Sequence, residues 1–125
     1  MDIKKENMQL TKFTSPTLDV ISLYRSQQGS QKELNYYIKE MEPKEKSLLV
    51  VGDFNFCYLD SSPNPTKQFL EANNFSQLIR EPTHIEGNLL DQAYFRNMDE
   101  LLECSAVVHS KYYTDHKGLA VIIKR

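Results

Sequence analysis

Apolar residues along the chain fall into short runs separated by turn residues, a pattern that predicts strands. The clearest strand is 47–51, a continuous apolar run typical of a strand buried on both faces, which ends at Gly52. Residues 18–24 are rich in β-branched and apolar side chains and predict an earlier strand. We expect further short strands at 75–79, 89–95, 106–109 and 119–123.

Two stretches have helical spacing instead. Ser30 and Glu33 form a capping box that begins a helix over 30–42, with apolar side chains recurring every three or four residues. Thr66 is the expected cap of a second, shorter helix. The resulting order, β-α-β-α-β-β-β-β, favours an α/β sheet that ends in antiparallel strands.

Composition changes this picture little. A chain of 125 residues suits one domain, and we place the domain at 8–125 after a polar leader, 1–7, that is expected to fray. A formal charge of −2 gives no global case for binding nucleic acid. No apolar run approaches the roughly 18 residues of a membrane span. Cys57 and Cys104 are expected to be thiols in a reducing, intracellular compartment.

Three polar clusters border the predicted strands. The first is GDFN at 52–55, which follows the buried strand. The second is Asp91, which lies within an apolar stretch and therefore needs a partner, because an unpaired carboxylate beside a core is costly. The third is Asp115 with His116, in a predicted loop. His116 is the obvious partner for Asp91, since a carboxylate on one imidazole nitrogen raises the basicity of the other.

In this order, GDFN at 52–55, LDQAYF at 90–95 and TDH at 114–116 resemble the signatures of the endonuclease/exonuclease/phosphatase family, which has the DNase I-like fold. The amino-acid sequence of residues 51–95 is most similar to the endonuclease domains of retrotransposons. The resemblance implies half of a four-layer α/β sandwich, with a mixed, mainly antiparallel sheet and helices on one face. It also implies DNA as a partner and a nuclear role.

The resemblance assigns roles to several residues. Asp53 and Asn55 would act on the attacking water and the scissile phosphate, while Asp91 would orient His116, which contacts the phosphate. Elementary chemistry agrees, because phosphodiester hydrolysis needs a base for the water and hydrogen bonds to the developing oxyanion. Asp53 suits the first task, and Asn55 and His116 suit the second.

Two further residues complete the implied site. Asp115 would lie near a divalent metal, and Tyr24 in SLYRS resembles a tyrosine that hydrogen-bonds the phosphate. Mg²⁺ or Mn²⁺ fits this set, because such an ion takes oxygen ligands and needs only one or two carboxylates.

The family's first half carries an Asn and a Glu that is the principal metal ligand, and no residue before Tyr24 resembles either. The resemblance therefore implies the C-terminal half of the domain. A half lacking its mate would expose an apolar sheet face, so we expect it to bind the missing half or to self-associate.

Other functions stay open. The chain fits a DNA endonuclease of a mobile element, inactive where truncated, but it also fits a non-catalytic remnant, a binding module or a phosphomonoesterase of the same fold. Asp53 and Asn55 also fit a plain Asx turn, and Asp115 and His116 an ordinary polar loop.

Overall fold

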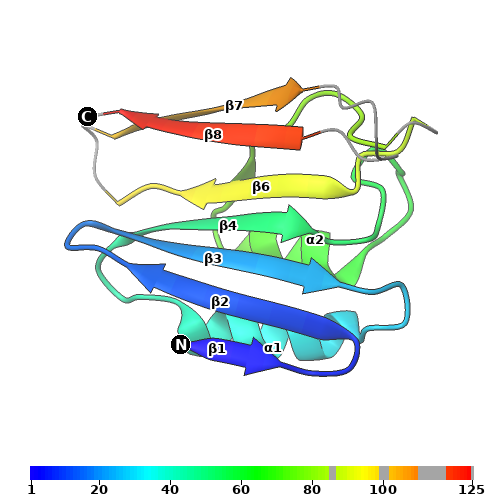
Figure 1. Ribbon diagram of the computed structural model, residues 1–125, viewed down its shortest axis with the longest axis horizontal. Helices are drawn as coiled ribbons and strands as arrows, with labels where there is room; N and C mark the ends of the chain where they lie inside the picture. The colour runs from blue at the N-terminus through cyan, green and yellow to red at the C-terminus, as the bar shows by residue number, and fades with distance from the viewer. Residues whose placement is uncertain (85–86, 99–101, 110–117, 125) are drawn as a thin grey trace.

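A six-stranded sheet backed by two helices forms the body of the molecule, and a two-stranded sheet lies beside it (Figure 1). The computed structural model describes residues 1–84, 87–98, 102–109 and 118–124. The strands are β1 (Asp2–Lys4), β2 (Met8–Thr14), β3 (Leu18–Arg25), β4 (Ser47–Asp53), β5 (Ser76–Gln77), β6 (Asp91–Arg96), β7 (Glu103–His109) and β8 (Gly118–Lys124). The helices are α1 (Gln31–Met41) and α2 (Pro65–Ala72).

The strand order of the larger sheet is β1-β2-β3-β4-β6-β5, and β7 pairs with β8. Strands β3 and β4 are parallel, joined through α1, and the other pairs are antiparallel. Both helices lie on the same face of the sheet (Figure 1). The predicted mixed, mainly antiparallel sheet with helices on one face is therefore confirmed.

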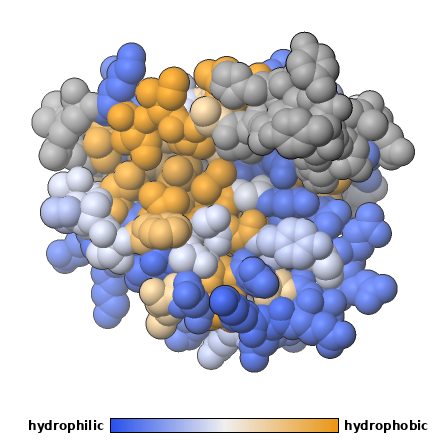
Figure 2. Space-filling model, viewed as in Figure 1, coloured by the Kyte–Doolittle hydropathy of each residue, from blue (hydrophilic) through white to orange (hydrophobic). Residues whose placement is uncertain are grey.

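Side chains that alternate along the strands build two apolar clusters. Leu23, Val50 and Tyr94 point to the helix side, where they pack with Leu34 and Ile38 of α1. The residues next to them in the strands point to the opposite face, because side chains alternate along a strand. There Leu49, Ala93 and Phe95 form a second cluster, which side chains of β7 and β8 adjoin. Figure 2 shows apolar side chains gathered on this second face, in its upper left part.

Helix α1 begins as predicted and α2 does not. Ser30 caps α1, since its hydroxyl accepts a hydrogen bond from the Glu33 amide at 3.1 Å. The prediction that Thr66 caps α2 is wrong: Asn64 is the cap, and its side chain accepts from the Lys67 amide at 3.0 Å. Pro65 takes the first helical position, where its missing N–H costs nothing, and this places the cap two residues earlier.

The first two strands were not predicted. Residues 1–7 were expected to fray, but Asp2–Lys4 pair with β2, and Ile3 packs against the helix-side cluster. The alternation of apolar and polar residues does not reveal strand β2, because Lys12 stands where an apolar residue is expected. The Lys12 ammonium is satisfied there, because it donates to the Met41 carbonyl at 2.8 Å and lies 3.6 Å from Asp19 Oδ2.

The later strands differ in length from their predictions. β4 extends to Asp53, while β5 is reduced to Ser76–Gln77 and β6 starts at Asp91 rather than at 89. Both Cys57 and Cys104 are free thiols, as predicted, and burial raises the pKa of the Cys104 thiol. No helix in the described part of the chain is long and apolar enough to cross a membrane.

Candidate functional site

Tyr24, Asp53 and Asp91 lie in one row across three neighbouring strands. Asp53, the last residue of β4, is the register partner of Tyr24 on β3 and of Asp91 on β6. Partners in register project from the same face of a sheet. Tyr24 follows Leu23, and Asp53 precedes Phe54, both members of the helix-side cluster. Asp91 is the register partner of Asp53, so all three project from the face away from the helices. This end of the sheet, where β3 and β4 end and β6 begins, is at the right of Figure 1.

The three side chains differ in exposure. Tyr24 is 48% exposed, while Asp53 and Asp91 are half-buried. The structure thus brings together three of the six predicted site residues in a place that solvent reaches.

Gly52 lets β4 come close to β3 just before Asp53. Its φ is 151°, and a Cβ at this position would collide with the backbone carbonyl of Leu23. Only glycine fits such an approach. The glycine of GDFN is therefore a requirement of the strand pairing that sets Asp53 beside Tyr24.

Asn55 follows in a tight turn. Its φ is 57°, a left-handed conformation that Asn tolerates better than most residues, and its amide donates to Asp53 Oδ1 at 2.9 Å. The strand ends at Asp53, so the alternation of side chains along β4 does not continue to Asn55. The turn is the Asx turn of the non-catalytic interpretation, and it also keeps Asn55 next to the row.

The start of β6 is fixed by a buried threonine. The Thr83 hydroxyl accepts hydrogen bonds from the amides of Leu90 and Asp91, at 3.0 and 2.9 Å. The Phe54 amide donates to the Leu90 carbonyl at 3.0 Å. The segments that carry Asp53 and Asp91 are thus tied directly to each other.

Sequence patterns missed several residues around the row. Gln9 on β2 is the register partner of Tyr24, and Lys4 on β1 is the partner of Gln9, so the polar row continues to the edge of the sheet. Both are exposed. No motif indicates them, because their place depends on the pairing of two strands that were themselves not predicted.

A buried arginine lies under the site. Arg25, next to Tyr24 in β3, is 4% exposed, and its guanidinium hydrogen-bonds the backbone carbonyls of Phe54 and Asn55. Burial lowers the pKa of Arg25 from its ordinary value, and attraction to Asp53 opposes that shift.

Asp115 and His116 lie outside the described residues, so the pairing of His116 with Asp91 and the place of Asp115 near a metal stay predictions. Within the described residues, no group of three or more His, Cys, Asp or Glu side chains gathers to hold a metal. Mg²⁺ needs only one or two carboxylates and keeps several waters. Asp53 and Asp91, in register on adjacent strands, fit that requirement.

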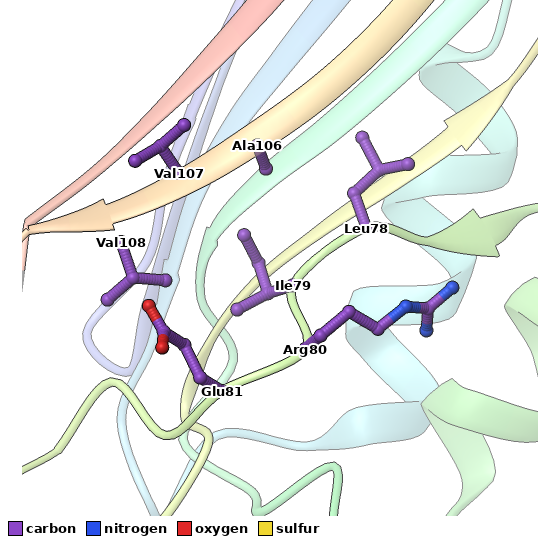
Figure 3. A pocket seen from close by; sticks show the side chains of 7 residues that line it. All are labelled: Leu78, Ile79, Arg80, Glu81, Ala106, Val107 and Val108. Carbon is purple, nitrogen blue, oxygen red and sulfur yellow. The ribbon is translucent and has the colours of Figure 1, made fainter.

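A pocket of about 380 Å³ lies elsewhere, between β7 and the segment after β5 (Figure 3). Its lining is Leu78, Ile79, Arg80, Glu81, Ala106, Val107 and Val108. Figure 3 shows the side chain of Ile79 directed toward β7 and that of Arg80 directed away from it. The lining is mostly aliphatic and holds no residue of the polar row, so the pocket is separate from the candidate site.

Comparison with known proteins supports the fold. The cytolethal distending toxin of Haemophilus ducreyi matches with a TM-score of 0.63 and 18% identity, over 97% of this chain and 54% of that chain. The toxin from Actinobacillus actinomycetemcomitans matches with a TM-score of 0.60 and 17% identity, over 94% and 53%. A Staphylococcus aureus beta toxin matches with a TM-score of 0.57 and 13% identity, over 93% and 56%.

Neither the family models nor the curated proteins that were compared with the chain gave a significant match. The comparisons therefore show the fold alone. The chain has the mixed α/β architecture of the DNase I-like fold, and it spans about half the length of the solved structures that it matches.

Proposed function

We propose that the chain is part of a metal-dependent phosphodiesterase of the DNase I-like type. The observation that carries this proposal is the register of Tyr24, Asp53 and Asp91, which puts a phenol and two carboxylates side by side at one edge of the sheet. A hydrolase needs its catalytic phenol and carboxylates together in a solvent-accessible place. A carboxylate with a purely structural role does not need a second carboxylate beside it.

Each residue has a task in the proposed reaction. Asp53 takes the proton of the attacking water, while Tyr24 and Asn55 hydrogen-bond the phosphate. Asp91 orients His116, which is predicted to contact the same phosphate. A Mg²⁺ or Mn²⁺ ion would supply positive charge to the developing oxyanion, with Asp115 as its predicted ligand and the oxygens of Asp53 and Asp91 close by.

DNA is the proposed substrate, and a mobile element the proposed source of the domain. Both proposals are supported by the amino-acid sequence of the motifs between residues 51 and 95, together with the fold. A nuclear site of action would follow from that substrate.

We further propose that the chain corresponds to the C-terminal half of the domain and binds the missing half, or a second copy, through the sheet face opposite the helices. Half-buried apolar side chains, among them Val20 and Val51, contribute to that face, and Val121 of β8 packs against the same cluster. The second candidate function, a non-catalytic remnant or binding module, is favoured by the Asx turn, because the hydrogen bond of the Asn55 amide to Asp53 Oδ1 gives that carboxylate a structural role.

The test is Mg²⁺-dependent nicking of supercoiled plasmid by the purified chain and by two variants, Asp53→Ala and Asp60→Ala. Asp60 is a matched control, because its carboxylate also accepts a hydrogen bond from the amide two residues later, at 2.8 Å, but it is exposed and outside the row. We expect nicking that Asp53→Ala reduces by about a hundredfold or more and Asp60→Ala leaves unchanged.

Two results would contradict catalysis by this chain. Nicking that survives Asp53→Ala would belong to a contaminant. No nicking by the parent at any Mg²⁺ or Mn²⁺ concentration would favour the non-catalytic remnant.

A further inference from the structure

Arg25 is a charged side chain in a place where apolar residues are the rule. It lies at the end of β3 on the helix side of the sheet, and Met8, a member of the helix-side cluster, is its register partner on β2. At 4% exposure, its guanidinium has almost no contact with solvent. A buried charge is costly unless its donors are satisfied, so the contacts of Arg25 indicate what the charge is for.

Those contacts are backbone carbonyls. Nε donates to the Phe54 carbonyl at 2.7 Å, Nη1 to the Gly29 carbonyl at 2.7 Å, and Nη2 to the Asn55 carbonyl at 3.2 Å. Phe54 and Asn55 come directly after the last residue of β4, so their carbonyls lie beyond the residues that pair in the sheet. Arg25 therefore holds the chain at the point where it leaves the sheet.

The other side of this turn is held from β6. The Gln92 side-chain amide donates to the Phe56 carbonyl at 2.8 Å, and the Phe54 amide donates to the Leu90 carbonyl at 3.0 Å. Residues 54–56 are thus fixed between two strands. On the β3 side, the described hydrogen bonds to the carbonyls of Phe54 and Asn55 come from one guanidinium.

We propose that Arg25 is a positioning residue, which sets the direction of Asp53 and Asn55 toward the substrate by clamping the turn between them. The inference rests on the proposed function for its catalytic consequence, but its structural part stands alone. The planar fork of arginine reaches three carbonyls at fixed angles, whereas a lysine ammonium is a single point of charge on a flexible stem. Replacement by lysine keeps the charge and loses the clamp.

Arg96 offers a matched control. It lies at the far end of β6 from Asp91, its side chain is 17% exposed, and it bonds Glu42 Oε2 at 3.0 Å and the Pro43 carbonyl at 3.4 Å. Arg96→Lys therefore removes a comparable part-buried fork without touching the turn.

The experiment compares Arg25→Lys, Arg25→Gln and Arg96→Lys by amide hydrogen exchange and urea unfolding. The reporter is the Asn55 amide, which donates to Asp53 Oδ1, and the reference is the Val50 amide in the middle of β4. We expect Arg25→Lys to lower the protection of Asn55 relative to Val50 by about tenfold, as the loss of a charge-assisted hydrogen bond predicts. Arg96→Lys should leave that ratio unchanged.

Equal loss of protection at Asn55 and Val50 would overturn the proposal, because Arg25 would then stabilise the fold as a whole. No change at Asn55 in Arg25→Lys would overturn it as well. Should Arg25→Gln fail to fold, Arg25→Lys carries the test, because its charge is retained.

Activity gives a separate readout. Where the parent nicks plasmid, we expect Arg25→Lys to lower kcat by about tenfold with little change in KM, because the scaffold that binds DNA is intact while the reacting groups are misaligned. The hydrogen-exchange result needs no substrate. An inactive parent would thus count against the proposed function and leave the clamp to be judged on exchange alone.

Discussion

Acidic side chains lie at both ends of the six-stranded sheet, in different surroundings. At one end Asp19, 1% exposed, sits between the ammonium groups of Lys46 at 2.8 Å and Lys12 at 3.6 Å. At the other end Asp53 and Asp91 are in register on adjacent strands and half-buried. The first end neutralises its carboxylate, and the second sets two carboxylates side by side.

The difference lies in what holds each group. Ion pairs also join Glu42 to Arg96 and Lys39 at the Asp19 end, each at 3.0 Å. At the other end, the Asp53 carboxylate accepts a hydrogen bond from the Asn55 amide, and the Asp91 amide donates one to the Thr83 hydroxyl. This end also carries Tyr24 in register with Asp53. We therefore interpret the Asp19 end as structural and the Asp53 end as the candidate functional one.

The largest expected effect is at the glycine that builds the Asp53 end. We expect Gly52→Ala to lower the free energy of unfolding by at least about 4 kcal/mol, because the new Cβ collides with the Leu23 carbonyl. Gly87→Ala is the control, with φ 89° but open space around a Cβ, and should cost about 1 kcal/mol. Urea unfolding measures both. Equal costs would mean that backbone strain alone, and not the close approach of β3, demands Gly52.

The next effect compares the carboxylates directly. Asp19→Asn should cost about 3 kcal/mol, because it leaves two lysines without their buried partner. Asp53→Asn keeps an oxygen for the turn and should cost less than about 1 kcal/mol. Urea unfolding at pH 7 gives both values. Should Asp53→Asn prove the more destabilising, the Asp53 end would be structural after all.

The smallest effect is a pH dependence at the Asp19 end. Burial tends to raise the pKa of Glu42, but hydrogen bonds and attraction from Lys39 and Arg96 outweigh it, and the pKa is lowered from 4.5. A lowered pKa in the folded state contributes stability above the unfolded value, which is lost as the pH falls through the folded value. Glu42→Gln should therefore cost about 1 kcal/mol at pH 7 and nothing well below the lowered pKa.

The measurement is urea unfolding of parent and variant between pH 7 and pH 2.5. Glu40→Gln, which changes an exposed carboxyl of the same helix, should show no difference at any pH. A cost of Glu42→Gln in unfolding free energy that stays constant down to the lowest pH would show that the charge of Glu42 does not cause the stabilisation.

The sequence predicted the fold through its local signals. The buried run before Gly52 and the capping box at Ser30 depend on residues close in sequence, and both are confirmed by β4 and α1. The resemblance of the motifs predicted the DNase I-like fold, which the structural neighbours support. Tyr24 was singled out from a short motif, and its register with Asp53 gives that choice a geometric basis.

The rest depends on contacts between distant segments. Nothing near Arg25 in the sequence indicates that it binds carbonyls of residues 54 and 55, and Gln9 joins the row only because β2 pairs with β3. Strand β2 itself was hidden by Lys12, a half-buried lysine whose ammonium is satisfied by the Met41 carbonyl and Asp19. Hydrophobic patterns do not encode such pairings.

The parallel pairing of β3 with β4 also bears on when the site forms. The β2–β3 pair closes over a short turn, but Tyr24 meets Asp53 only after α1 is packed, and Asp53 meets Asp91 only when β6 inserts between β4 and β5. Contacts of longer sequence separation form more slowly, because each must first close a longer loop. We therefore expect the candidate site to be assembled late in folding, so that a partly folded chain would carry the motifs in its sequence without yet bringing their side chains together.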